Sequence, residues 1–347
     1  MSASATIPSI MRASVLLEKQ KIEMQERPVP RPAPDEVLIH VRSVGVCGSD
    51  VHYYMEGRIG DFVVDRPIVL GHEVSGVIVD VGSEVSPDRV GQRVAIEPQR
   101  PCRRCRHCKT GRYNLCERME FYATPPIDGA FCDYVVAPAD FAHPVPDALS
   151  DHAAALLEPF SVGIWACTKA RVEPGFRVFV TGAGPIGALA SLAARSFGAS
   201  EVVVTDLVES RRGRILGFGA TSAHDPRDPD FDVRALAADA FIECSGATPA
   251  VVSGLEALRG GGVAVLVGLG AEQMAIPVQH LMNKELILTG VFRYVDTWPK
   301  AMAAAMQPGI NLDGLVTAEF ELEDTEAALT SDSDPLSMKS VVVVSRA

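Results

Sequence analysis

Four cysteines within fifteen residues form the densest group of reactive side chains in the sequence. Cys102, Cys105, Cys108 and Cys116 have the spacing C-x2-C-x2-C-x7-C. Four thiolates in one short loop can complete a tetrahedral shell around Zn2+, and a closed shell leaves no position for a substrate. An iron–sulfur cluster is the competing interpretation, but ferredoxin sequences place the fourth cysteine closer and follow it with proline. The spacing therefore predicts a structural zinc lobe over about residues 98–118.

A second set of metal-ligating residue types is dispersed. Cys47 lies in GVCGSDVH, and His72 and Glu73 are adjacent in VLGHEVSG. A thiolate, an imidazole and a carboxylate supply three ligands and leave a fourth position for water or a substrate oxygen, as in a catalytic zinc site. Taken singly, His72 also fits a hydrogen-bonded core histidine, and Cys47 a small buried hydrophobe. Twenty-four residues lie between Cys47 and His72, so the hypothesis requires that folding bring them together.

A glycine-rich segment, FVTGAGPIGALASLAARSFGASEVVVTD, indicates a nucleotide site. Gly182, Gly184 and Gly187 have G-x-G-x-x-G spacing between a predicted strand at 176–181 and a predicted helix at 185–197. In a dinucleotide-binding fold these glycines permit the turn, the approach of the pyrophosphate and close helix–strand packing. The helix N-terminus, with Pro185 and Ile186 in its first turn, would offer N–H groups to the phosphates. Glycines used only for a turn remain the alternative.

Asp206, at the end of the next predicted strand (201–205), favours NAD over NADP. A carboxylate there accepts hydrogen bonds from the ribose hydroxyls and repels a 2′-phosphate. Arg211 and Arg212 follow closely and keep NADP open as an alternative.

The pattern of apolar residues changes near residue 160. Residues 31–158 contain short Val/Ile-rich runs broken by Gly and Pro, which is typical of barrel strands. Later runs alternate with Ala/Leu-rich helical segments, which predicts a parallel α/β sheet with strands at 240–243, 263–267 and 286–291 as well. A last strand is expected at 340–344. The stretch 219–241 is short for a strand plus a full helix, so one crossover is predicted to be trimmed.

Composition limits the function classes. The 347 residues carry a formal net charge of −12 and a pI of about 5.2, which disfavours nucleic acid as a partner. The basic cluster from Arg100 to Arg112 interleaves with the cysteines and is interpreted as a solvated loop rather than a polyanion site. We find neither a signal-peptide pattern nor an apolar run long enough to span a membrane. With eight cysteines that fit metal binding better than disulfides, a cytoplasmic location is expected.

Together these motifs resemble the zinc-containing medium-chain dehydrogenases, and the sorbitol (polyol) dehydrogenase branch in particular. The resemblance runs nearly end to end and also includes GRYNLC, FYATPPIDGAFCDYV, LLEPFSVG and VFRYVDTWP. It implies a GroES-like β-barrel catalytic domain over 1–158 and 292–347, and a Rossmann doubly wound NAD-binding domain over 159–291. It also implies a homo-oligomer, a tetramer or a dimer.

The resemblance assigns roles residue by residue. Cys47, His72 and Glu73 would hold the catalytic zinc, with Asp50 supporting the shell and Glu158 as a second-shell carboxylate or alternating ligand. Ser49 would relay the substrate proton and His52 pass it onward. Residues of the polyol pocket would be Tyr53, Phe121, Thr124, Glu158, Arg293 and Tyr294, while Arg211 would join the glycines and Asp206 at the cofactor.

These assignments predict oxidation of a secondary hydroxyl of an alditol, such as sorbitol or xylitol, to a ketose with hydride transfer to NAD. One zinc ion would be catalytic and one structural in each chain. Two alternatives stay open: a sister zinc dehydrogenase for 2,3-butanediol, threonine or another alcohol, and a non-enzymatic protein that binds nucleotide or zinc.

Overall fold

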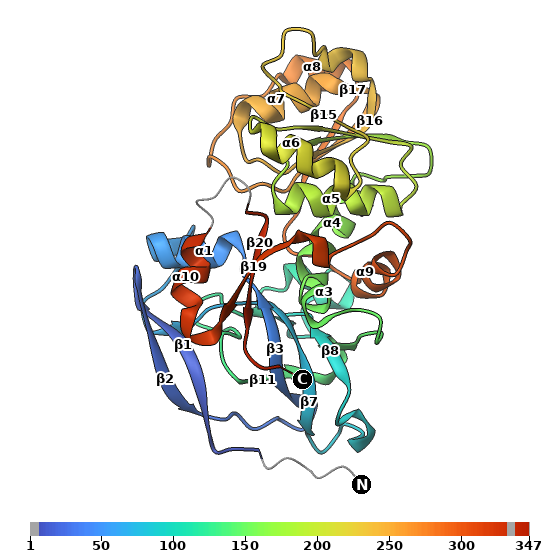
Figure 1. The fold of residues 1–347 in the computed structure, drawn as a ribbon. Coiled ribbons are helices and arrows are strands. Elements are labelled where there is room, and N and C mark those ends of the chain that lie inside the picture. The colour runs from blue at the N-terminus through green and yellow to red at the C-terminus, as the bar shows by residue number, and fades with distance from the viewer. Residues whose placement is uncertain (1–6, 332–336, 347) are drawn as a thin grey trace. The chain divides into compact units, whose positions relative to one another are not determined.

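The computed structural model describes residues 7–331 and 337–346 and divides the chain into two compact units. One unit comprises Met1–Glu158 and Leu312–Ala347, and the other comprises Pro159–Asn311. Residues 292–311, which the sequence analysis grouped with the first unit, have their contacts in the second. In Figure 1 the chain passes from the first unit into the second once and then returns to the first unit for its last segment.

The first unit is built on a sheet of seven strands, six of them in the order β12-β8-β7-β3-β20-β19, with β11 also paired to β3. All neighbours are antiparallel except β19 and β20, which run parallel. The strands are β3 (Glu36–Gly45), β7 (Glu73–Val81), β8 (Arg93–Ile96), β11 (Tyr134–Pro138), β12 (Ala142–Pro144), β19 (Val316–Glu321) and β20 (Lys339–Val343). A smaller sheet has the order β2-β1-β6, from β1 (Ile10–Glu18), β2 (Lys21–Pro28) and β6 (Ile68–Val69).

Short elements complete this unit. They are the helices α1 (Gly48–Glu56), α2 (Arg106–Lys109), α3 (Asp151–Ala155) and α10 (Thr325–Thr330), and the short strands β4 (Arg58–Ile59), β5 (Phe62–Val63), β9 (Gln99–Arg100) and β10 (Glu120–Phe121). The apolar side chains of β1, β3, β7 and β8 form one core with those of residues 130–137 and of β20.

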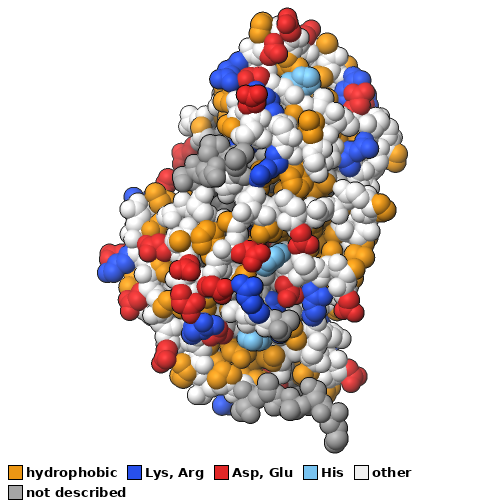
Figure 2. All heavy atoms as spheres, in the orientation of Figure 1, with side chains coloured by type: hydrophobic (Ala, Val, Ile, Leu, Met, Phe, Trp, Pro, Cys, Tyr) orange, Lys and Arg blue, Asp and Glu red, His pale blue; other side chains and the backbone are white. Residues whose placement is uncertain are grey.

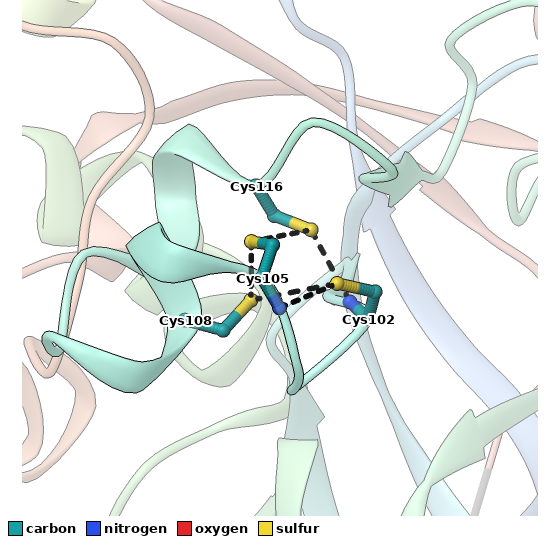
Figure 3. A group of neighbouring side chains, drawn as sticks. All are labelled: Cys102, Cys105, Cys108 and Cys116. Atoms are coloured by element: carbon teal, nitrogen blue, oxygen red, sulfur yellow. Dashed lines mark hydrogen bonds between the residues drawn. The ribbon is translucent and has the colours of Figure 1, made fainter.

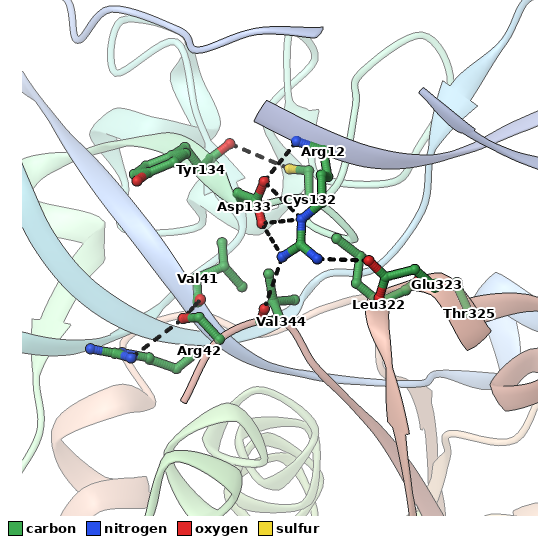
Figure 4. A network of polar contacts seen from close by, with 11 residues as sticks. Arg12, Val41, Arg42, Cys132, Asp133, Tyr134, Leu322, Glu323, Thr325 and Val344 are labelled. Carbon is green, nitrogen blue, oxygen red and sulfur yellow. Dashed lines mark hydrogen bonds and ion pairs between the residues drawn. The ribbon is translucent and has the colours of Figure 1, made fainter. Parts of the chain in front are cut away.

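A polar network centred on Arg12 connects the N-terminal strand β1 with the C-terminal segments at Glu323 and Val344 (Figure 4). The Arg12 guanidinium donates to Asp133 at 2.8 Å, to Glu323 at 2.7 Å and to the carbonyl oxygen of Val344 at 3.4 Å. Individual surface ion pairs contribute about 0–1 kcal/mol, but this network joins four segments that are distant in sequence. It fixes the C-terminal strand β20 within the first unit.

The second unit holds a parallel six-stranded sheet in the order β15-β14-β13-β16-β17-β18. This is the strand order 3-2-1-4-5-6 of a doubly wound dinucleotide-binding fold. Its strands are β13 (Arg177–Thr181), β14 (Glu201–Thr205), β15 (Ser222–His224), β16 (Ala238–Glu243), β17 (Leu258–Leu266) and β18 (Ile287–Gly290). Its helices are α4 (Leu157–Lys169), which begins at the unit boundary, α5 (Pro185–Ser196), α6 (Glu209–Ile215), α7 (Thr248–Ala257), α8 (Val278–Asn283) and α9 (Trp298–Ala305).

The predicted α/β class and the trimmed crossover are confirmed. Between β15 and β16 the chain forms only a turn of 3-10 helix, Val233–Leu236, where the other crossovers carry an α-helix. The strand cores are Val-rich and buried because helices cover a parallel sheet. Phe179 and Phe241 stack at 5.5 Å between ring centroids on adjacent strands of this core.

Among the described residues, no helix is long and apolar enough to cross a membrane. On the face shown in Figure 2, acidic and basic side chains lie interspersed, and no continuous basic stripe is visible there.

Candidate functional site

The four cysteines of the predicted lobe converge on one point. Their sulfur atoms lie within 4.8 Å of one another, with Cys105 Sγ at 3.5 Å from Cys108 Sγ and 3.9 Å from Cys116 Sγ (Figure 3). Tetrahedral Zn–S bonds of about 2.3 Å require sulfur–sulfur distances of about 3.8 Å. The geometry therefore fits a zinc ion with four thiolate ligands.

Hydrogen bonds within the loop stabilise negative charge on two of these sulfurs, those of Cys102 and Cys105. Hydrogen bonds from the backbone N–H groups of Arg104 and Cys105 lower the pKa of Cys102 to about 6. Burial raises the pKa of Cys108 to about 12, and so do its side-chain hydrogen bonds with the neighbouring cysteines. A metal ion binds deprotonated cysteines and displaces their protons, so four converging sulfurs, one of them with a lowered pKa of about 6, fit a metal site.

The dispersed set Cys47, His72 and Glu73 also converges, in the first unit. One ligand atom of each lies within 4.8 Å of the others. Cys47 follows the end of β3 and is the N-cap of α1, whereas Glu73 is the first residue of β7 and pairs in register with Gly45. Gly71, with φ of 89°, makes the turn that leads into β7. The pairing of β3 with β7 and the N-terminus of α1 thus bring the three side chains together. Cys47 follows the carboxyl end of β3 and lies at the N-terminus of α1, the positive end of the helix dipole.

Asp50 holds two of these residues in place. Its fully buried carboxylate accepts hydrogen bonds from the backbone N–H of Cys47 and of Gly71, each at 3.0 Å. Its Oδ1 also lies 3.5 Å from His72 Nδ1. A carboxylate on one ring nitrogen of a histidine leaves the other nitrogen for a metal, as is usual for metal-ligating histidines.

The electrostatics of the set favour a cation. Burial lowers the pKa of His72, but the negative charges of Asp50 and Cys47 outweigh it and raise that pKa well above its ordinary value. Glu73 is fully buried, and its Oε2 has no hydrogen-bond partner among the described residues. An unpartnered buried carboxylate oxygen is costly, so the donor set Cys47, His72 and Glu73 fits a divalent ion such as zinc.

Several other residues predicted for this site belong to the first unit as well. Ser49 and His52 lie in α1 one turn apart, with Ser49 half-buried and the His52 side chain 49% exposed. Phe121 is buried, and its ring centroid lies 5.6 Å from that of His72. Thr124 follows it in a tight turn, its N–H donating to the Phe121 carbonyl at 3.2 Å.

Tyr53 and Glu158 are both buried. Tyr53 lies in α1, and Glu158 lies in the first turn of α4. The roles of all these residues in substrate binding and proton transfer remain predictions.

The glycine motif occupies the turn between β13 and α5. Gly182 has φ of 89°, which a side chain disfavours, and Gly184 is the N-cap of α5, with open space where a Cβ would be. A Cβ at Gly187 would lie 1.8 Å from the Gly182 carbonyl oxygen. Pro185 and Ile186 begin the helix. The turn, the open approach and the close packing are the three features that a pyrophosphate site requires.

Asp206 follows β14 beside this turn. Its Oδ2 accepts from the Ala183 N–H at 2.7 Å and its Oδ1 from the Val208 N–H at 2.8 Å. Arg212 Nη1 donates a hydrogen bond to the Asp206 carbonyl oxygen at 2.8 Å and forms an ion pair with Asp225 at 3.3 Å. Arg211 lies in α6, with no partner for its buried Nε among the described residues. The Asp206 carboxylate is thus fixed beside the glycine turn.

Arg293 and Tyr294 belong to the second unit. Arg293 has φ of 54° and its guanidinium lies 4.8 Å from the Phe292 ring centroid, whereas Tyr294 is fully buried against Trp298. Their assignment to the polyol pocket remains a prediction.

The sequence analysis did not identify Lys339, a charged residue in contact with the predicted ligand Glu73. The buried Lys339 donates from Nζ to Glu73 Oε1 and to the Val46 carbonyl oxygen, the latter at 2.7 Å. The only signal in the sequence is a lysine directly before the predicted strand SVVVV, which is equally typical of a strand end in solvent.

Comparison with known proteins agrees with this geometry. Family models described as the alcohol dehydrogenase GroES-like domain and as zinc-binding dehydrogenase match residues 33–147 and 185–307. The chain is 43% identical to sorbitol dehydrogenase from Bos taurus, over 92% of each chain. It is 41% identical to sorbitol dehydrogenase from Bacillus subtilis, over 93% of this chain and 94% of that one.

A solved structure is similar over nearly its whole length. The crystal structure of L-idonate 5-dehydrogenase from Escherichia coli has 32% identity and a TM-score of 0.91, covering 96% of this chain and 98% of that chain. The resemblance drawn from the motifs, including the GroES-like and Rossmann classes, is confirmed. This chain belongs to the zinc-containing, NAD(P)-dependent medium-chain alcohol dehydrogenase family.

Proposed function

We propose that this protein oxidises a secondary hydroxyl of an alditol such as sorbitol or xylitol to a ketose and transfers the hydride to NAD. The observation that carries the proposal is the convergence of Cys47, His72 and Glu73 within 4.8 Å, in a chain 41–43% identical to two sorbitol dehydrogenases. A Cys, a His and a carboxylate supply three ligands and leave a position for a substrate oxygen.

When bound there, zinc supplies Lewis acidity that makes a hydroxyl easier to deprotonate near neutral pH. The protein's own task is to hold the three donors still. Asp50 does so through the Cys47 backbone and the His72 ring, and such outer contacts are commonly worth about 10–100-fold in metal affinity.

The substrate proton must leave the buried site. Ser49 is half-buried, and His52 lies three residues further along the same helix face with its side chain 49% exposed. Glu56 Oε1 lies 4.0 Å from His52 Nδ1, one turn further along the same helix. This arrangement supports a proton path from hydroxyl to imidazole to water, and such proton transfer contributes on the order of 10²–10⁴-fold to rate.

NAD is the proposed cofactor because of Asp206. Its carboxylate is held by two backbone N–H groups at 2.7 and 2.8 Å, beside the first glycine of the phosphate-binding turn. A fixed negative charge at this position accepts ribose hydroxyls and repels a 2′-phosphate.

The proposal is tested by initial rates of NAD reduction with sorbitol, xylitol, galactitol, arabinitol and 2,3-butanediol. We expect the highest kcat/KM with an alditol, and a preference for butanediol would favour the sister-dehydrogenase alternative instead. Cys47→Ala should abolish turnover. Cys132→Ala is the matched control, because Cys132 is a buried cysteine of the same unit outside both metal sets.

The active form is proposed to be a homo-oligomer, a tetramer or a dimer. Sedimentation velocity of the NAD-bound enzyme tests this directly, and a single monomeric species with full activity would contradict it.

A further inference from the structure

The two oxygens of the Glu73 carboxylate have different surroundings. Oε1 accepts a hydrogen bond from Lys339 Nζ, whereas Oε2 has no hydrogen-bond partner among the described residues. The residue is fully buried, so water does not compensate the second oxygen. A carboxylate with one oxygen in a hydrogen bond has its other oxygen available as a single metal ligand.

Lys339 reaches this carboxylate because of the strand order. It is the first residue of β20, which lies beside β3 on the side opposite β7, and Gly45 of β3 pairs with Glu73 on one side and Val341 on the other. The backbone N–H of Val46 donates to the Ser340 carbonyl at 2.9 Å and anchors the start of β20.

The ammonium group of Lys339 is itself fixed. Only 5% of the residue is exposed, and Nζ donates to the Val46 carbonyl at 2.7 Å as well as to Glu73. Glu73, Cys47 and Glu158 all place negative charge near it. A buried lysine is tolerated when its charge is paired and its donors are used, and both conditions hold here.

Gly45 bounds the carboxylate on another side. A Cβ at this position would lie 2.0 Å from Glu73 Oε2 and 3.0 Å from its Cδ. Real Cβ contacts are not that short, so only glycine leaves room for the carboxylate in this orientation. Lys339 and Gly45, both outside the metal-ligand set, therefore determine the orientation of the Glu73 carboxylate.

We propose that Lys339 is a positioning residue for the metal ligand Glu73: it holds Oε1, so that Oε2 serves as a one-oxygen ligand, and it shares the carboxylate charge with the metal. The inference rests on the proposed catalytic metal site and adds a residue that controls its coordination. Without the ammonium group, both oxygens and the full negative charge become available to the metal.

The test uses the full-length protein with zinc in the four-cysteine lobe and Co2+ at the Cys47 site, followed by visible absorption without substrate. Lys339→Met should shift the cobalt d–d bands and reduce their intensity, because a second carboxylate oxygen raises the coordination number. Lys339→Arg, which keeps the cation and its donors, should restore the wild-type spectrum. Should the methionine variant fail to fold, Lys339→Gln takes its place with the same expected shift.

Lys284→Met is the matched control, since Lys284 Nζ also donates to a buried strand carbonyl, that of Leu258, in the second unit. It should leave the cobalt spectrum unchanged. A Lys339→Met spectrum identical to wild type, or an arginine variant as altered as the methionine one, would overturn the positioning role while leaving the metal site intact. A wild-type protein without any cobalt band sensitive to Cys47→Ser would overturn the metal site and the inference together.

Discussion

Replacing Asp50 by Asn should weaken the catalytic metal site while leaving the fold in place. The wild-type carboxylate accepts two backbone N–H groups at 3.0 Å and faces His72 Nδ1 at 3.5 Å. An amide has one acceptor oxygen and turns an NH2 group toward a second donor, so one buried N–H loses its acceptor. That loss costs about 1–3 kcal/mol of unfolding free energy. The loss of the charge behind His72 should reduce zinc affinity by about 10–100-fold, or roughly 1.4–2.7 kcal/mol.

The assay is competition for zinc with a chromophoric chelator, which distinguishes the two proposed metal ions of each chain, together with urea unfolding of the metal-loaded protein. Asp128→Asn is the control, because Asp128 also accepts a strand N–H, that of Val69 at 2.8 Å, without touching a proposed ligand. Affinity of the Asp50→Asn variant within a factor of two or three of wild type would refute the reasoning, since Asp50 would then not orient His72.

Four further outcomes are expected. Gly187→Ala places a Cβ 1.8 Å from the carbonyl of the first motif glycine and should lower unfolding stability by at least about 1–3 kcal/mol, measured in urea with and without NAD. Asp206→Ala removes the proposed hydrogen bonds between the carboxylate and the ribose hydroxyls of NAD, worth about 1.5–3 kcal/mol, so the NAD-to-NADP ratio of kcat/KM should fall roughly 10–100-fold. An unchanged ratio would exclude Asp206 as the determinant of cofactor preference. Cys105→Ser should lose one zinc per chain by elemental analysis and lower Tm, while retention of both ions would contradict the four-thiolate site. The Arg177 ion pair lowers the pKa of Glu201, so its stabilising effect is complete above the unfolded pKa of about 4.3 and is lost as pH falls through the folded pKa; Glu201→Gln should flatten the acid side of the Tm profile.

The parts of this molecule that sequence predicts best are local. The four cysteines share one loop, so their spacing alone gives the cluster that the structure contains. The predicted strand at 201–205 and the helix starting at Pro185 match β14 and α5, because Val-rich runs and the glycine turn fix them within a few residues. The short 219–241 stretch likewise predicts the missing helix.

Features that depend on tertiary pairing were harder to predict. The contact between Lys339 and Glu73 joins residues 266 positions apart and exists only because β20 pairs beside β3. No periodicity in the C-terminal segment indicates that pairing. Similarly, β17 begins at Leu258, before the predicted 263, because Leu258 already pairs with Ala238; the register then shifts across the glycines, and regular pairing resumes at Val263. The convergence of Cys47 with His72 could be expected only from the resemblance.

The central claim is that Cys47, His72 and Glu73 bind one catalytic zinc ion. Anomalous diffraction at the zinc edge, from crystals of fully active enzyme, tests it most directly. The account predicts two peaks per chain, one among the four cysteines and one bounded by Cys47 Sγ, the His72 ring and a single Glu73 oxygen. Active crystals with a peak only at the cysteine lobe would contradict it.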